Sequence, residues 1–415
     1  MHIPSRRQVL TGVAAGATPL IASPRRARAQ PRDGVVRIGV LADFSGPYRD
    51  TSGPTALTCA QQAVEDLGLA ARGIQVEVLQ GDHQNKPDVA LALSRQWIDQ
   101  RGVDMVCEVN NSAIALAVAG LVQEKDKVQV NTGALSAALT GERCSRNTVH
   151  WTADTWMLAN AVGTATVRSG GDTWYFVTAD YAFGHQMERD LRRFVEAAGG
   201  RVLGAARFPF PSTTDFAAFL LQAQSSRAKV VGLLMAGADM VNCIKQAREF
   251  GLTRRGTRLA GTPMFVTDIH AMGLEVAQGL AVAEAFYWDL NERTRAFLDR
   301  VRPKTPNNWP NQEHAGTYAG VYHYLKAVAD LGAERAKASG LEVVGRMKAM
   351  PTDDDAFGPG RVREDGRKIH PAYFFEVKSP AESRGPWDYY KLVGTVEAEQ
   401  AFRPIAEGNC PLVRR

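Results

Sequence analysis

Short apolar runs that end in turn residues alternate with longer amphipathic segments along most of this chain. A short apolar, β-branched run bounded by turn signals predicts a buried strand of a parallel sheet, and 3.6-residue periodicity predicts a helix. The first run, 35–42, passes through Asp43-Phe44-Ser45-Gly46-Pro47 into a helical pattern near Pro54. This stretch therefore predicts a strand, a loop and a helix, the first unit of a doubly wound α/β domain.

The alternation continues past residue 130 and then restarts near Gly170, which predicts two α/β lobes without a close sequence repeat. Predicted strands cover 74–79, 103–109, 128–130, 173–177, 201–208 and 229–234, and predicted helices cover 86–101, 112–123, 154–167, 181–198, 216–225 and 241–250. Further helices are expected over 292–302, 313–331 and 341–350, followed by a candidate hairpin from Val362 across Gly366 to 373–377.

Residues 1–29 have the pattern of an export signal. Arg6 and Arg7 precede a weakly apolar run, 9–22, and Ala27-Arg28-Ala29 follows as a small-residue cleavage site. This order is typical of a signal peptide, and paired arginines are typical of the twin-arginine route. A chance Arg-Arg pair in a tail is the alternative. We expect export to the periplasm with cleavage near Ala29.

The charge balance argues against a nucleic-acid partner. The chain has 49 basic and 44 acidic residues, and residues 1–29 hold five arginines and no acid. Without that segment, 49 less five leaves 44 basic residues against 44 acidic ones. A nucleic-acid surface needs a basic excess, so we expect no such partner.

Five cysteines are present, and none are in C-x-x-C spacing. Cys59, Cys107 and Cys243 lie in apolar patterns and are expected to be buried. Cys144 and Cys410 lie in polar, turn-rich contexts, so in an oxidising compartment we expect them to form a disulfide. Both being free is the alternative, because connectivity cannot be deduced from sequence.

The chain lacks the motifs of nucleophile elbows, P-loops, dinucleotide sites and zinc proteases. His83 follows a predicted strand, and we interpret it as a hydrogen-bonded loop residue rather than a base. A secreted hydrolase would need an activated nucleophile, and the sequence offers none. We expect no enzyme, no metal and no cofactor.

Polar loops after the predicted strands are candidates for a small-molecule site, because ligands of open α/β sheets bind beyond the carboxyl ends of the strands. Structural roles explain some of these residue types equally well. Ser112, Asp154 and Asp180 could be helix N-caps, and Asp239 could stabilise the first turn of a helix. Trp156 could pack in the hydrophobic core. The candidate ligand-binding residues are Ser45, Tyr48, Asn111, Ser112, Asn131, Thr132, Gly133, Ala134, Tyr181, Gly237, Asp239 and Asp268.

Several segments resemble the periplasmic solute-binding proteins of ABC transporters, of the branched-chain amino acid (Leu/Ile/Val) type. The resemblance lies in 37–41 with Ser45-Gly46-Pro47, in Asp82 with Pro87 and Ala90, in 180–184, in 232–237 and in 385–390. It implies two α/β lobes of doubly wound parallel sheets, joined by a multi-strand hinge and closing on one ligand. We expect lobe 1 over 30–152 with 287–350, lobe 2 and the hinge over 153–286 with 351–400, and a tail over 401–415.

The resemblance also implies roles for single residues. Ser112 and Thr132, with main chain near Ala134, match positions that hold an amino acid carboxylate, and Tyr181 and Asp268 match lobe 2 positions, Asp268 taking the ammonium. Asn110-Asn111 and Asp239 depart from the family pattern, which favours amides, aromatic acids or other small carboxylates beside amino acids. The expected protein is a monomer that passes its solute to membrane permease subunits. A sensor of the same fold that feeds a signalling partner is the alternative.

Overall fold

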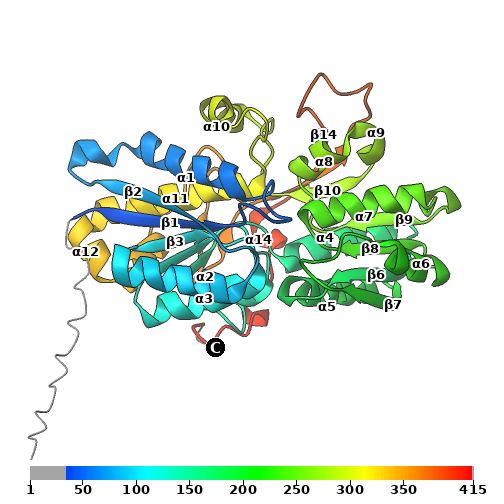
Figure 1. The fold of residues 1–415 in the computed structure, drawn as a ribbon, viewed down its shortest axis with the longest axis horizontal. Helices are drawn as coiled ribbons and strands as arrows, with labels where there is room; N and C mark the ends of the chain where they lie inside the picture. Colours follow the sequence, from blue (N-terminus) through cyan, green and yellow to red (C-terminus); the bar gives the residue numbers. More distant parts are fainter. Residues whose placement is uncertain (1–33, 414–415) are drawn as a thin grey trace, which may run out of the picture.

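The structure is a computed structural model that describes residues 34–413. The export segment predicted over 1–29 therefore lies outside the described residues. Two α/β lobes lie side by side along the long axis of the molecule (Figure 1). None of the helices between residues 34 and 413 is long and apolar enough to cross a membrane.

Lobe 1 is built on a five-stranded parallel sheet in the order β2-β1-β3-β4-β5. Every residue of β3 and β4 is buried, as expected for central strands covered on both faces. The strands are β1 Val36–Ala42, β2 Val76–Asp82, β3 Met105–Glu108, β4 Val128–Asn131 and β5 Thr148–His150.

Helices cover both faces of this sheet. One core joins α1 and α11 to the sheet, and a second core joins α2 and α3 to its other face (Figure 1). Pro54 in the first turn of α1 and the left-handed Gly68 after it fit the usual start and end of a helix. The helices are α1 Gly53–Leu67, α2 Pro87–Gln96, α3 Ser112–Glu124, α10 Glu292–Val301, α11 Gln312–Leu331, α12 Ala333–Ala338 and α13 Gly340–Ala349.

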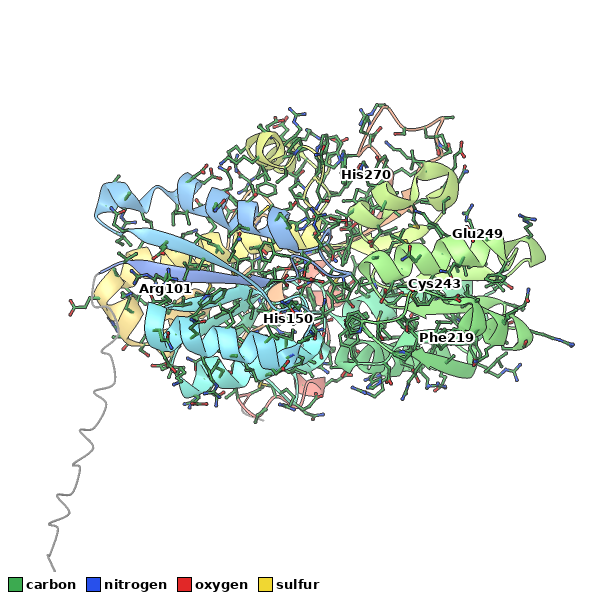
Figure 2. All side chains as sticks on the ribbon, in the orientation of Figure 1. Arg101, His150, Phe219, Cys243, Glu249 and His270 are labelled. Atoms are coloured by element: carbon green, nitrogen blue, oxygen red, sulfur yellow. A yellow bond between two sulfur atoms is a disulfide. The ribbon has the colours of Figure 1, made fainter. Side chains whose placement is uncertain are left out.

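Lobe 2 repeats the plan on a four-stranded parallel sheet in the order β7-β6-β8-β9. Helices α4 and α5 share one core with the sheet, and α6, α7 and α8 share another, in which Cys243 of α7 is buried (Figure 2). The elements are β6 Thr173–Ala179, β7 Arg201–Phe208, β8 Val230–Leu234, β9 Arg258–Gly261, α4 Thr155–Arg168, α5 Ala182–Ala197, α6 Ala217–Ser225, α7 Gly237–Glu249, α8 Val266–Met272 and α9 Leu274–Ala277.

A three-stranded antiparallel sheet, in the order β10-β13-β14, lies where the lobes join. Its strands are β10 Ala281–Glu284, β13 Ala372–Val377 and β14 Tyr390–Val396. The predicted hairpin is wrong in part, because β11 Arg361–Val362 pairs with β12 Lys368–Ile369 and β13 instead joins the hinge sheet. The two α/β lobes and their parallel sheets agree with the predicted fold class.

The segment 351–400 does not belong to lobe 2 alone, as the sequence had suggested. Ala356, Phe357 and Val362 pack into the lobe 1 core with β1 and α11. Phe375 and Val377 of β13 pack into the lobe 2 core. The chain therefore stays in lobe 1 from α13 as far as β11 before it enters the hinge sheet.

The buried guanidinium of Arg367 braces two places where the chain passes between the lobes. Arg367 is fully buried and donates to the carbonyl oxygens of His150 and Thr152, and its Nη1 lies 3.2 Å from a carboxylate oxygen of Asp154. Asp154 is also the N-cap of α4, where it accepts from the backbone N–H of Met157. One arginine thus ties the segment before β13 to the segment that enters lobe 2.

The tail after β14 is tied to both lobes. A disulfide joins Cys144 of lobe 1 to Cys410, with 5.6 Å between the Cα atoms, which is the pairing expected from the sequence. Arg193 of α5 in lobe 2 forms an ion pair of 2.9 Å with Glu407 of the tail. The other three cysteines are free and buried.

Replacing both Cys144 and Cys410 by serine is expected to lower the free energy of unfolding by about 2–5 kcal/mol, because the disulfide closes a long loop in the unfolded chain. Urea denaturation of oxidised protein and of the double variant measures the difference. The wild type under reducing conditions should match the variant. Equal midpoints for the oxidised wild type and the variant would contradict the prediction.

Candidate functional site

A pocket lies between the lobes, beyond the carboxyl ends of the strands of both sheets. In this closed arrangement the pocket is partly open to solvent and has a cavity volume of about 20 Å³, enough for about one water molecule. Its walls combine aromatic rings with a few polar groups. The lining residues are Tyr48, Thr51, Asn110, Ser112, Gly133, Leu135, Tyr181, Phe183, Ala236, Phe265 and Glu313.

A left-handed turn after β3 forms the polar wall. Glu108 and Val109 both have positive φ, at 72° and 58°, which is unusual for any residue other than glycine and especially for a β-branched one. The turn ends the predicted strand at Glu108 and directs Asn110 and the start of α3 into the pocket. Asn111 is the N-cap of α3, so its side chain holds the helix end rather than the pocket wall.

Gly133 lines the pocket because nothing larger fits there. A Cβ atom on Gly133 would lie 2.5 Å from a Glu108 carboxylate oxygen and 2.6 Å from the Cβ of Asn110. Glu108 is itself held from behind, since its carboxylate accepts hydrogen bonds from the hydroxyls of Thr132 at 2.6 Å and Thr317 at 2.9 Å. The Thr132 hydroxyl therefore supports Glu108.

Contacts across the pocket bring the two lobes together. The hydroxyls of Tyr48 in lobe 1 and Tyr181 in lobe 2 share a hydrogen bond of 2.7 Å. Phe210 of lobe 2 stacks on both rings, with centroids 5.2 Å from Tyr48 and 4.5 Å from Tyr181. The backbone N–H of Ala238 donates to the carbonyl oxygen of Pro47 at 3.0 Å. The structure therefore represents a closed arrangement of the lobes.

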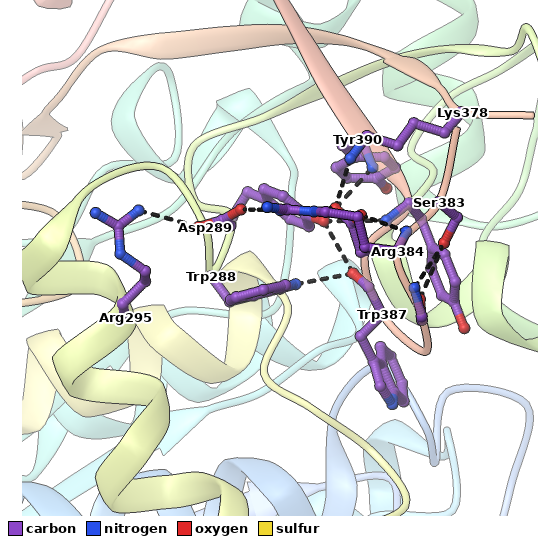
Figure 3. Close-up of polar contacts among 12 residues, drawn as sticks. Trp288, Asp289, Arg295, Lys378, Ser383, Arg384, Trp387 and Tyr390 are labelled. Carbon is purple, nitrogen blue, oxygen red and sulfur yellow. Dashed lines mark hydrogen bonds and ion pairs between the residues drawn. The ribbon is translucent and has the colours of Figure 1, made fainter. Parts of the chain in front are cut away.

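A loop between β13 and β14 adds a further contact between the lobes, outside the pocket (Figure 3). The carbonyl oxygen of Trp387 accepts from the Tyr287 hydroxyl and from Nε1 of Trp288, both at 2.8 Å. The indole of Trp387 stacks on His270 of lobe 2 and on Trp309, with centroid distances of 4.0 and 5.8 Å. Trp309 lies in the segment that leads from α10 to α11.

Buried carboxyl groups surround the pocket. Burial raises the pKa of Asp239 to about 7, that of Asp268 to about 7 and that of Glu284 to about 8. Burial, together with the nearby Glu108, Asp268 and Glu284 carboxyls, raises the pKa of Glu313 well above its usual value. No lysine, arginine or histidine is among the lining residues, so the pocket of the described chain carries only potential negative charge.

The structure brings some of the predicted site residues to the pocket and leaves others behind it. Tyr48, Ser112, Gly133 and Tyr181 line the pocket. Gly237 and Asp239 lie in the first turn of α7, next to the contact with Pro47. Ala134 is held by Asn131, whose side chain bonds both its N–H and its carbonyl oxygen, and the Ser45 hydroxyl donates to Asp82.

Asp268 does not reach the pocket wall. It lies in the first turn of α8, and its Oδ2 accepts the backbone N–H of Phe265 at 2.9 Å. The structure places it in a short helix that the sequence pattern did not predict. One of its two carboxylate oxygens therefore binds backbone, and the ammonium role that the resemblance implies for Asp268 stays a prediction.

Sequence reasoning did not select seven of the lining residues. Asn110, Phe183 and Ala236 fell inside the predicted loops, and Leu135 follows one of them, but their positions gave no reason to prefer them. Thr51, Phe265 and Glu313 come from segments outside those loops. Glu313 starts a helix that was predicted, but an acid in a first turn usually complements the helix dipole.

This architecture, two parallel-sheet lobes closing on a small polar pocket through a strand hinge, defines the class of type I periplasmic binding proteins. A family model described as "Periplasmic binding protein" matches residues 35–385, and the chain belongs to this family. This is a family of solute-binding proteins and not of enzymes. A search among curated proteins found no match.

Solved structures agree with this assignment. A periplasmic binding protein from Burkholderia mallei is 43% identical, with 92% of this chain and 100% of that chain covered and a TM-score of 0.87. A branched-chain amino acid ABC transporter periplasmic ligand-binding protein from Burkholderia xenovorans is 36% identical, with 91% and 99% covered and a TM-score of 0.78. A Rhodopseudomonas palustris solute-binding protein in complex with 3,4-dihydroxybenzoic acid shares the fold at 20% identity, with 88% and 98% covered and a TM-score of 0.78.

Gly237→Ala is expected to hinder closure, because a Cβ atom there would lie 2.5 Å from the Pro47 carbonyl oxygen across the cleft. A shift of about 1.4 kcal/mol toward the open state weakens solute binding about tenfold. Small-angle scattering in the presence of a solute that stabilises the wild type should give a larger radius of gyration for the variant. Gly199→Ala is the control, since Gly199 has a positive φ and an unobstructed Cβ position. A radius equal to the wild type would contradict the prediction.

Stability is expected to fall between pH 6.5 and 8. The folded-state pKa of Glu284, about 8, lies above the unfolded value of about 4.3, so the folded state binds more protons and loses stability as pH rises through this range. Histidines with lowered pKa, such as His314 at about 3, act in the opposite direction only below about pH 6.5. The melting temperature should fall by about 3 °C, and Glu284→Gln should flatten the profile. An unchanged slope in this variant would contradict the assignment.

Proposed function

We propose that this protein captures a small polar organic solute, an amino acid or a related small carboxylate or amide, by closing its two lobes around the pocket. The observation that carries the proposal is the direct contact of Tyr48 and Tyr181 across the mouth of a small pocket between the lobes. Rings from both lobes cover this pocket, so the closed arrangement suits a small ligand.

The chemistry of the walls supports a ligand with a polar end and an apolar body. The polar end faces Asn110 and Ser112, at the positive end of the α3 dipole. The apolar body lies among Leu135, Phe183 and Phe265. Both features are common to amino acids and related small carboxylates.

Closure follows from contacts that only the closed state makes. Tyr181, Phe183 and Phe265 come from lobe 2, and Tyr48 and Ser112 come from lobe 1, so a ligand held by both sets favours the closed arrangement. The closed form then presents both lobes to membrane permease subunits of the importer. Residues 1–29 direct export to the periplasm in this proposal.

A panel of amino acids, their amides and small aromatic acids is expected to contain at least one compound that stabilises the protein. A ligand at one hundred times its Kd adds about 2.7 kcal/mol, which raises the melting temperature by about 5 °C or more. Tyr181→Phe should reduce the shift for the same compound, because it removes the hydrogen bond to Tyr48. Turnover of a substrate without any stabilising compound would refute the proposed function.

A further inference from the structure

The carboxyl group of Glu313 lines the pocket without a partner. Glu313 lies in the first turn of α11 and is 3% exposed. No hydrogen bond or ion pair reaches its carboxylate from any residue of the described range, 34–413. An unpaired buried carboxylate is costly, so groups of this kind normally have a hydrogen-bond donor or a cation beside them.

The neighbours of Glu313 increase this cost. The nearest carboxyls that affect it, Glu108, Asp268 and Glu284, are all acidic, and no cation is among the pocket-lining residues of the described chain. His314 does not supply one. Its Nδ1 accepts from the backbone N–H of Asn311, its Nε2 donates to the carbonyl oxygen of Ser52, and burial lowers its pKa to about 3.

Helix capping does not account for Glu313. The side chain of Asn311 caps α11, and its Oδ1 accepts the backbone N–H groups of both Glu313 and His314, at 2.9 and 3.0 Å. The Glu313 carboxylate accepts neither of these N–H groups. Capping therefore gives no reason for a carboxyl group at this position of the pocket wall.

We propose that Glu313 receives a positively charged nitrogen of the ligand, so that the protein selects solutes with an ammonium, amidinium or guanidinium group and rejects purely anionic acids. The proposal rests on the proposed function and names the ligand class of the same pocket. It assigns the cation to lobe 1, whereas the sequence had suggested Asp268 of lobe 2. It also separates this protein from the structural relative crystallised with 3,4-dihydroxybenzoic acid, which lacks such a nitrogen.

The opposite wall permits a second polar group on the same ligand. Nδ2 of Asn110 is buried and donates to no residue of the chain from 34 to 413, while its Oδ1 accepts from His83 and from the backbone of Asp43. Asn110 and Ser112 can therefore donate to a carboxylate or carbonyl oxygen. A zwitterion or an amino amide satisfies both walls.

Binding of a cation at Glu313 is coupled to protonation. The pKa of free Glu313 is raised by burial and by the surrounding carboxyls, and a cation beside it lowers that pKa again. In the pH range in which the free carboxyl is protonated, ligand binding therefore releases a proton, and affinity rises with pH. Calorimetry in two buffers of different ionisation enthalpy should detect the release.

The experiment compares compounds that share a body and differ in their head group. The sets are L-phenylalanine, phenethylamine and 3-phenylpropionate; L-leucine, isopentylamine and 4-methylpentanoate; and benzamidine with benzoate. Wild type, Glu313→Gln and Glu334→Gln are measured by thermal shift and calorimetry. Glu334 lies on α12 at the far end of lobe 1 and is exposed, so it controls for the loss of one negative charge.

We expect the compounds with a cationic nitrogen to stabilise the wild type and their deaminated partners to have no effect. Glu313→Gln should weaken the binding of the compounds with a cationic nitrogen at least tenfold and abolish proton release. Glu334→Gln should change neither the affinity nor the proton release. A ligand-free melting temperature for Glu313→Gln at or above the wild-type value shows that the variant is folded, because the substitution removes a buried unpaired carboxyl.

The deaminated acids decide against the proposal if they bind the wild type as tightly as their amino partners, or if Glu313→Gln leaves amine binding unchanged. Either result overturns the role of Glu313 and leaves the proposed function standing. Mass spectrometry of solute released from the denatured protein adds a second route: a nitrogenous cation supports the proposal, and a nitrogen-free acid overturns it. If no compound binds and no solute is released, the proposed function itself fails.

Discussion

The buried guanidinium of Arg367 is the interaction on which the joint between the lobes depends. It binds the carbonyls of His150 and Thr152 and faces the Asp154 carboxylate, and these groups belong to the segment that leaves the lobe 1 sheet and enters α4. A fully buried charge is tolerated only when such partners surround it. Arg367 immediately precedes β12, and the hinge sheet follows. Its side chain therefore holds together two segments that pass between the lobes, the one from β5 to α4 and the one from β12 to β13. The position of lobe 2 over the lobe 1 side of the cleft therefore depends on contacts at this joint.

The hinge sheet packs mainly against lobe 2. Glu284 of β10 accepts from the backbone N–H of Val266 at the start of α8 and from the Tyr390 hydroxyl of β14, at 3.0 and 2.8 Å. Phe375 of β13 packs in the lobe 2 core. The polar groups of the pocket belong to lobe 1, whereas lobe 2 contributes mainly rings. Under the proposed function, lobe 1 provides the chemical recognition and lobe 2 excludes water, so the charges of the lobe 1 wall decide which ligand binds.

Much of the fold follows from the sequence, because buried parallel strands are short apolar runs and their order is regular. The position of Ser112 and Tyr181 after predicted strands was enough to bring both to the pocket wall. Glu313 was not recoverable, since an acid in a first helical turn is ordinary and only three-dimensional packing shows that its carboxylate is unused. The backbone contact of Asp268 was hidden, because α8 is too short to give a periodic pattern. The packing of Ala356, Phe357 and Val362 in lobe 1 depends on long-range contacts that the local pattern does not encode.

The C-terminal tail gives the joint a property that the pocket does not reveal. It leaves the hinge sheet after β14 and passes Phe402, whose ring packs on His370 at 4.8 Å. It is then held to lobe 2 through Glu407 and to lobe 1 by the disulfide at Cys410. The tail therefore crosses the joint with unequal attachments: a covalent one to lobe 1 and, to α5 of lobe 2, an ion pair between two solvent-exposed side chains. Because an exposed ion pair contributes only about 0–1 kcal/mol, an oxidising compartment fixes the tail to lobe 1 and leaves its contact with α5 easily broken.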